Sequence, residues 1–265
     1  MRIVRTVADL REARAALAGE IGLVPTMGAL HGGHLALLAA ARAENDAVVM
    51  SLFVNPAQFD EPCDLAAYPR DEERDVGLAE NAGVAVVFAP PVEELYPAGF
   101  QTWVDVAETA RGLEGDMRPG HFRGVATVCL KLFGLVRPAR AYFGQKDAQQ
   151  LAVVRALVRD LALPLAVRAV PTVRDPDGLA ASSRNVRLGA GERTEALALP
   201  RALAAGAEAH RRGDDPVAAA RAALNGLTPD YVGLLDVDGS LVLAAAARVG
   251  QTRLLDNVLL EGELE

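Results

Sequence analysis

The stretch Ile21-Gly-Leu-Val-Pro-Thr-Met-Gly-Ala-Leu-His-Gly-Gly-His34 decides how this chain folds. Its first half has the apolar pattern of a strand, and an alanine-rich helical pattern follows directly. Glycines at such a junction let the backbone approach a ligand, and the N–H groups at a helix start carry a partial positive charge. If residues 32–34 already turn helically, the two imidazoles share one helix face. The stretch therefore predicts a phosphate site at the end of a strand.

Strand and helix patterns alternate after this junction. We expect strands at 48–54, 84–88, 140–143 and 165–173, helices at 71–81, 125–136 and 148–161, and a loop-rich insert before residue 125. Short apolar strands separated by helices are typical of parallel βαβ units in a doubly wound α/β sheet, where ligands bind beyond the carboxyl ends of strands. The polar segments 31–34, 55–58 and 144–147 each follow a strand. Residues 1–174 are therefore predicted to form a Rossmann-like domain with its site at these ends.

The character of the chain changes at Arg174-Asp-Pro-Asp-Gly178, where the pairs Asp-Pro and Asp-Gly predict turns. Beyond it we expect a helix over 191–211 that bends near Pro200, a helix over 216–227, and two strands at 231–236 and 252–260. Residues 175–265 are thus predicted to form a small α+β domain that caps the site.

Composition limits the functions that the chain can have. Its 265 residues, 51% hydrophobic, suffice for a buried core, and no run of about 18 apolar residues could span a bilayer. A net charge of −8 argues against a general nucleic-acid-binding protein, so an anionic ligand needs a local group of donors. Two cysteines are too few for a disulfide framework, and the N-terminus is too charged for a signal peptide. We expect a soluble, cytoplasmic protein without a membrane or nucleic-acid partner.

Lysine is rare in this chain, and its positions are informative. Of 27 lysine and arginine residues, only Lys131 and Lys146 are lysine. A compact, mobile ammonium can do what a planar guanidinium cannot. Lys131 lies inside an apolar run, where it could equally have survived by chance. Lys146 lies in the segment 144–147, where it could supply a point charge to a phosphate while Asp147 caps the next helix.

Other polar segments each allow two interpretations. Ser182-Ser-Arg184 could be a polar turn, or it could bind a polyphosphate from a mobile second domain. Arg118, His121 and Arg123 could form a solvated loop, or they could contact a substrate or a neighbouring subunit. The acidic residues within 71–75 are expected to form an exposed helix start, because acidic side chains suit the helix dipole there.

Taken together, these segments resemble the pantothenate synthetase (pantoate–β-alanine ligase) family of nucleotidyltransferases with a His-x-Gly-His signature. The likeness runs nearly the whole chain, in one order, through the segments 24–34, 51–59, 65–70, 113–115, 118–125, 143–151, 170–173, 177–185 and 255–257. Two departures are visible: Gly32 stands where the family often has Asp, and Gln145 where it often has Glu. Neither departure removes a histidine, lysine or arginine of the motifs.

The resemblance implies a ligase of coenzyme A biosynthesis that condenses pantoate with β-alanine to pantothenate. ATP is consumed through a pantoyl-adenylate intermediate, and AMP and diphosphate are released. The resemblance also implies Mg²⁺ bound with ATP, its protein ligands being unknown, and a homodimer.

Site roles follow from the same resemblance. His34 is the proton donor or charge stabiliser, helped by the further catalytic residues His31, Lys146 and Arg184. The amide of Gln58 contacts pantoate and β-alanine, and that of Gln150 contacts pantoate, as hydrogen-bonding amides can. The residues implied to line the ATP site are Met27, Gly28, Ala29, Leu30, His31, Gly32, Gly33, His34, Gly144, Gln145, Lys146, Asp147, Val173, Ala181, Ser182, Ser183 and Arg184.

Two other functions stay open at this point. Another adenylyl- or cytidylyltransferase with the same two-histidine motif would leave its nucleotide on the product. A non-catalytic nucleotide-binding regulator on the same fold would bind ATP without releasing diphosphate. The glycine spacing matches neither the dinucleotide-binding fingerprint nor the P-loop, so those two kinds of nucleotide site are disfavoured.

Overall fold

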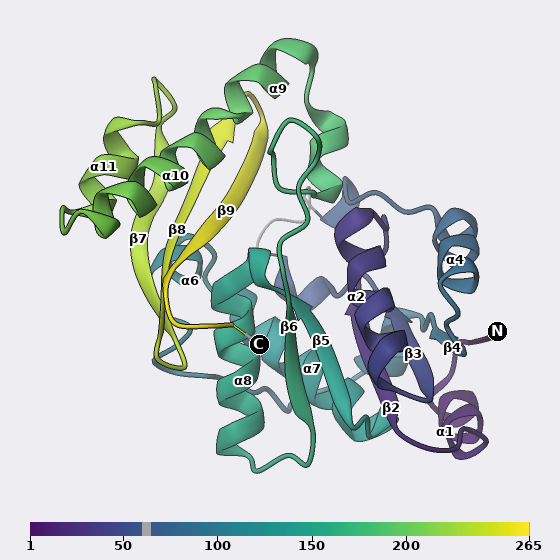
Figure 1. Ribbon diagram of the computed structural model, residues 1–265. Coiled ribbons are helices and arrows are strands. Elements are labelled where there is room, and N and C mark those ends of the chain that lie inside the picture. Colours follow the sequence, from purple (N-terminus) through teal and green to yellow (C-terminus); the bar gives the residue numbers. More distant parts are fainter. Residues whose placement is uncertain (60–64, 265) are drawn as a thin grey trace.

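A computed structural model describes residues 1–59 and 65–264; residues 60–64, including Cys63, and residue 265 lie outside that description. Six strands form one parallel sheet in the order β1-β4-β3-β2-β5-β6 (Figure 1). The strands are β1 (Arg2–Val4), β2 (Ile21–Thr26), β3 (Ala47–Leu52), β4 (Val86–Phe88), β5 (Arg140–Gly144) and β6 (Ala166–Val170). The predicted doubly wound α/β sheet is confirmed, and β1 is an additional edge strand.

The direction in which strands are added reverses between β2 and β5. From β2 the chain passes through α2 (Gly32–Glu44) to β3, and then through α4 (Glu72–Asn81) to β4. From β5 it passes the other way through α8 (Ala148–Asp160) to β6. Such a switch point leaves a crevice beyond the strand ends, where ligands of open α/β sheets bind.

Helices cover both faces of the sheet because strand side chains alternate between the faces. Ile21 and Leu23 point into a core that contains residues of α1 (Val7–Ala15), α7 (His121–Val136) and α8. Val24 points to the opposite face, which α2 and α4 cover. The predicted helix from residue 125 begins earlier, at His121, so the end of the expected loop-rich insert is helical. The insert also contains the short helices α5 (Val92–Leu95) and α6 (Leu113–Met117).

The C-terminal part, which we call the cap (residues 175–264), has its own antiparallel sheet of β7 (Pro229–Val237), β8 (Ser240–Val249) and β9 (Thr252–Glu261). Helices α9 (Ala190–Ala196), α10 (Ala198–Arg211) and α11 (Pro216–Ala222) share its core (Figure 1). The small α+β architecture is confirmed. The prediction of two strands was wrong, because the alanine-rich β8 lies between them.

The long helix expected in the cap is broken at Leu197, between α9 and α10. The break lies close to Pro200, as predicted, because proline has no N–H for the carbonyl four residues earlier and its ring clashes with that carbonyl. Val237, Val242 and Leu264 of the cap pack into the core that contains α7 and α8, which fixes the cap beside the switch point. In the described part of the chain no helix has the length and apolar character needed to cross a bilayer.

Candidate active site

His31 and His34 lie side by side at the start of α2. His31 is the N-cap residue, and its Nδ1 accepts the N–H of Gly33 at 3.1 Å. His34 Nδ1 accepts the N–H of His31 at 3.3 Å, and the two ring centroids are 4.2 Å apart. The rings thus share one side of the helix start, as their spacing predicts. The backbone N–H groups of His31 and Gly33, which were expected to face a phosphate, instead donate to the two imidazoles. The imidazole rings are therefore the donors that remain for a phosphate.

Both imidazoles are neutral near pH 7. Burial, together with the neighbouring His31, lowers the pKa of His34 to about 3. Burial and the charge of Lys146 also lower the pKa of His31. Because each Nδ1 accepts an N–H, the single ring proton lies on Nε2. Each ring therefore offers one N–H donor, and a bound polyanion would favour its protonated form.

A carboxylate from α4 holds the turn between β2 and His31. Gly28 and Ala29 have left-handed backbones, with φ of 86° and 52°, a conformation that residues with a Cβ rarely adopt. Asp75, 1% exposed, accepts the N–H of Ala29 at 2.7 Å and that of Leu30 at 2.8 Å. A Cβ on Gly28 would come within 2.8 Å of Asp75 Oδ2, so glycine is required there.

The expectation that the acidic residues of 71–75 are all exposed is wrong for Asp75. The carboxylates at 71, 72 and 73 are exposed, whereas Asp75 is buried on the inner face of the helix. Its partners lie 45 and 46 residues earlier in the chain, which no local pattern could indicate.

We expect Asp75→Asn to loosen the turn at residues 27–30. The amide can replace only one carboxylate oxygen, and it places an NH₂ group against a backbone donor. Loss of one charge-assisted hydrogen bond should speed hydrogen exchange of the Ala29 or Leu30 amide by roughly tenfold or more. Exchange mass spectrometry measures this, with Glu73→Gln on the exposed side of α4 as the control. Equal protection in both variants would mean that the turn does not depend on Asp75.

Lys146 and Asp147 follow β5 in the 3₁₀ turn η2 (Gln145–Asp147), across the switch point from the histidines. The Lys146 side chain is 15% exposed, and its Nζ lies 3.4 Å from Asp147 Oδ1. Asp147 occupies the N-cap position of α8, but its carboxylate is directed to Lys146 and makes no hydrogen bond to the helix start, so the prediction that its side chain caps this helix was wrong. Although burial raises it, Lys146 and Arg184 hold the pKa of Asp147 below its ordinary value. Asn257 Nδ2 in β9 donates to the carbonyls of Gln145 at 2.8 Å and Lys146 at 2.7 Å, so the cap fixes this turn.

One cavity brings together most of the residues predicted from distant segments. It lies at the switch point between the strand ends and the cap. The predicted residues in its wall are Met27, His31, His34, Gln58, Lys146, Asp147, Gln150, Ser182, Ser183 and Arg184. Ser182 and the turn η3 (Ser183–Arg187) bring the hydroxyls and the guanidinium to it from the cap. Imidazole N–H groups, an ammonium, a guanidinium and hydroxyls around one space suit a polyphosphate.

A second cavity adjoins the first and has seven lining residues in common with it, five of which are predicted site residues: His31, His34, Lys146, Asp147 and Gln150. Four more residues implied for the nucleotide site, Gly33, Gly144, Val173 and Ala181, line this second cavity. A ligand with a polyphosphate beside the imidazoles could therefore place its remaining part between the ends of β2, β5 and β6.

In the described part of the chain, five residues implied for the nucleotide site line neither cavity: Gly28, Ala29, Leu30, Gly32 and Gln145. The first three form the turn that Asp75 holds. A Cβ on Gly32 would lie 3.5 Å from Val173 Cγ1, an ordinary contact, so this position tolerates a side chain. Gln145 Nε2 donates to the carbonyl of Leu264 at 2.6 Å. An ionised Glu has no donor for that bond, which gives the departure at this position a structural reason.

The glutamines differ in what their amides do. Gln149 supports the loop before α6: its Oε1 accepts the N–H of Glu114 at 3.0 Å, and its Nε2 donates to the carbonyls of residues 109, 111 and 112. Gln58 Oε1 accepts from Asn55 at 3.0 Å, whereas its Nε2 contacts the sulfur of Met27 at 3.1 Å. Thioether sulfur is a weak acceptor, so Gln58 can donate to a better one.

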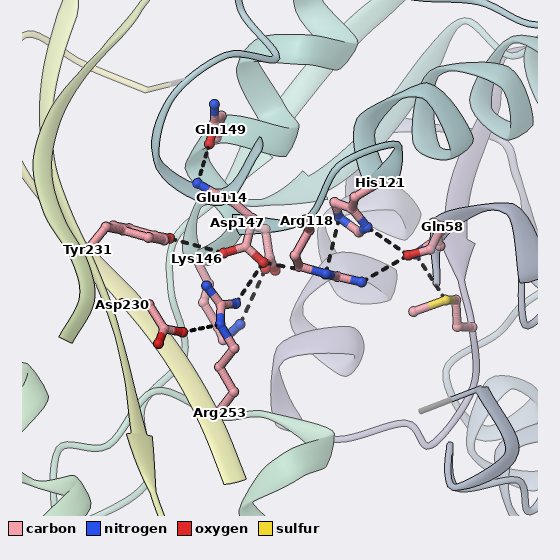
Figure 2. A network of polar contacts seen from close by, with 11 residues as sticks. Gln58, Glu114, Arg118, His121, Lys146, Asp147, Gln149, Asp230, Tyr231 and Arg253 are labelled. Carbon is pink, nitrogen blue, oxygen red and sulfur yellow. Dashed lines mark hydrogen bonds and ion pairs between the residues drawn. The ribbon is translucent and has the colours of Figure 1, made fainter. Parts of the chain in front are cut away.

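The basic residues of segment 118–123 have separate roles. Figure 2 shows Arg118 and His121 converging on Gln58, whose backbone carbonyl accepts Arg118 Nη2 at 2.9 Å and His121 Nδ1 at 2.9 Å. Both residues line the cavity. Arg123 is placed elsewhere: it pairs with Asp105 and lies over the ring of Trp103, 5.0 Å from its centroid.

Comparison with known proteins agrees with this geometry. The family model described as pantoate–β-alanine ligase matches residues 2–259. The pantothenate synthetase of Roseiflexus castenholzii is 52% identical over 277 residues, which cover 98% of this chain and 100% of that protein. The crystal structure of pantothenate synthetase from Thermus thermophilus matches with a TM-score of 0.93 and 48% identity, over 99% of this chain and 100% of that one. Pantoate–β-alanine ligase from Francisella tularensis, complexed with β-γ ATP and β-alanine, matches with a TM-score of 0.85 and 34% identity over the full length of both chains.

Proposed function

Because this chain belongs to the pantoate–β-alanine ligase family, we propose that it joins pantoate to β-alanine at the expense of ATP. The pantoate carboxylate attacks the α-phosphorus, and diphosphate leaves. The amine of β-alanine then attacks the acyl carbon of the pantoyl adenylate, gives up a proton, and AMP leaves. Adenylation is needed because a free carboxylate would have to expel oxide, whereas AMP is a good leaving group.

The observation that carries this proposal is the convergence of His31, His34, Lys146 and Arg184 on one cavity. Charge builds up on the phosphate oxygens and the leaving diphosphate during in-line attack, and preorganised donors lower the barrier by stabilising it. We assign the Nε2–H of His34 to that charge as donor or proton source, with His31 beside it. Lys146 supplies a point charge, and Ser182, Ser183 and Arg184 bind the phosphates from the cap.

The remaining assignments follow the two cavities. The second cavity, with Gly33, Gly144, Val173 and Ala181, takes the nucleoside part of ATP. Gln58 and Gln150, on the wall of the first cavity, hold pantoate through its hydroxyl and carboxylate oxygens, and Gln58 also contacts β-alanine. Because the imidazoles are neutral, the negative charge of the triphosphate is balanced by Lys146, Arg184 and a cation.

Mg²⁺, a homodimer and a cytoplasmic location complete the proposal. Among the described residues, no three His, Cys, Asp or Glu side chains gather closely enough to hold a metal ion. Mg²⁺ would therefore be held mainly by phosphate oxygens and water, and Asp147 offers a carboxylate that borders both cavities.

Product analysis tests the function against the two alternatives. We expect ATP and pantoate to give diphosphate with the adenylate retained, and free AMP to accumulate only after β-alanine is added. A nucleotidyltransferase that keeps the nucleotide on its product would give no AMP with the amine. A nucleotide-binding regulator would release no diphosphate, so chromatography of the nucleotides with and without each substrate decides among the three.

A further inference from the structure

Glu114 is a buried carboxylate at the contact between the cap and the body of the molecule. It lies in α6, its side chain is 7% exposed, and it lines the first cavity. Two donors reach it from the cap: Arg253 Nη1 of β9 at 2.8 Å and the hydroxyl of Tyr231 in β7 at 3.3 Å (Figure 2). Arg253 is fixed in turn by Asp230, whose Oδ2 accepts its Nε at 2.5 Å.

Arg118 continues this network toward the substrate side of the cavity. Its Nη1 lies 3.4 Å from Glu114 Oε1, and its Nη2 donates to the backbone carbonyl of Gln58 at 2.9 Å (Figure 2). The guanidinium of Arg118 thus connects Glu114, which contacts the cap, to Gln58, whose side-chain amide lines the cavity. The contacts run without a gap from Asp230 in the cap to Gln58 in the body.

The charges of this network make it sensitive to the loss of one member. Although burial raises it, Arg253 and Arg118 hold the pKa of Glu114 below its ordinary value, so the group is an anion at neutral pH. A buried anion between two guanidinium groups is costly to remove, because both cations then lose part of the charge that compensates them. The position of Arg118 therefore depends on Glu114, which Arg253 and Tyr231 of the cap hold in turn.

We propose that Glu114 is a positioning residue that couples the cap to the pantoate pocket, acting on Gln58 through Arg118. The inference rests on the proposed function insofar as it assigns pantoate to Gln58. When Arg253 and Tyr231 reach Glu114, the carboxylate holds Arg118 where it fixes the Gln58 carbonyl. The cap thus supports the pantoate pocket through this network.

Glu114→Gln tests this coupling, because the amide keeps the shape and removes the charge. We expect the KM for pantoate to rise about tenfold, the effect of one lost charge-assisted hydrogen bond, while the KM for ATP changes less than about twofold. The control is Asp238→Asn, which removes another contact between cap and body: Asp238 lies 3.5 Å from Arg155 and 3.6 Å from Arg159 of α8. A general loosening of the cap would raise both KM values, in both variants, and would overturn the proposal.

A double variant shows whether the effect passes through Arg118. If it does, Glu114→Gln combined with Arg118→Gln should raise the KM for pantoate no more than the worse single variant. If the two substitutions instead raised the KM for pantoate by the product of their separate effects, the coupling would be contradicted.

A measurement without turnover separates the coupling from the proposed function. Glu114→Gln should speed hydrogen exchange of residues 55–59, and Asp238→Asn should not. Unchanged exchange in Glu114→Gln would refute the coupling whatever the reaction is. Faster exchange in an enzyme that releases no diphosphate with pantoate would keep the coupling and refute the assigned substrate.

Discussion

Replacing His34 with alanine is expected to slow pantoyl-adenylate formation by about 10²- to 10³-fold, the loss seen when one preorganised donor to a developing charge is removed. The dissociation constant for ATP should change by no more than about threefold, because the contact strengthens as charge builds up in the transition state. Single-turnover release of diphosphate, compared with equilibrium binding of ATP, measures the two effects separately.

The large effect follows from how His34 is held. Its Nδ1 is occupied by the N–H of His31, and burial keeps the ring neutral, so the ring of this cavity residue is held with its proton on Nε2 before ATP arrives. Water that filled the space left by alanine would not be oriented in this way. His34→Gln, whose amide nitrogen can occupy nearly the same place, should retain more activity than His34→Ala.

The control for this variant is His210→Ala, since His210 lies at the end of α10 and pairs with Glu261 in the cap. It should leave both the rate and the affinity unchanged. His34→Ala also removes the hydrogen bond to the His31 N–H at the start of α2, which lowers the melting temperature. The activities are therefore compared well below the melting temperature of the variant. Equal losses of ATP affinity and of rate would contradict the role assigned to His34.

The parts of the fold that were predictable are those whose signals are local. The segment 21–34 contains a complete strand, turn and helix start, and the structure places β2 and α2 there. Strand β8 was missed because the run 244–247 is alanine, which favours helix when read alone. In the structure this run pairs with both β7 and β9, and that tertiary pairing outweighs the local preference.

The candidate site shows the same division. Its two imidazoles are three residues apart, so their neighbourhood could be derived from helix geometry. Lys146 was noticed because lysine is rare in this chain. Asp75, Glu114 and Arg253 were given no role in the site, although Glu114 lies in the segment 113–115 that resembles the family. Each acts on residues far away in the sequence: Asp75 on a turn 45 residues earlier, and Arg253 on a carboxylate 139 residues away. A charged residue that supports a site from a distant element looks like any surface charge until the fold is known.

Lys146→Arg is expected to reduce the rate of adenylate formation by about 10²-fold or more, although the charge is conserved. The Lys146 side chain is 15% exposed between the two cavities, where a planar guanidinium needs more room than an ammonium. The backbone cannot retreat to make that room, because Asn257 holds the carbonyls of Gln145 and Lys146. The guanidinium would then be displaced toward Asp147 or into the space of the phosphates.

Lys131→Arg is the matched control, because Lys131 is the other lysine of the chain. Its Nζ lies over the ring of Phe100, 4.6 Å from the centroid, a contact that a guanidinium makes equally well. We therefore expect Lys131→Arg to keep the wild-type rate, and single-turnover assays with saturating ATP and pantoate compare the two variants. If Lys146→Arg kept the wild-type rate as well, the site would need only a positive charge at this position. The scarcity of lysine would then carry no information about the mechanism.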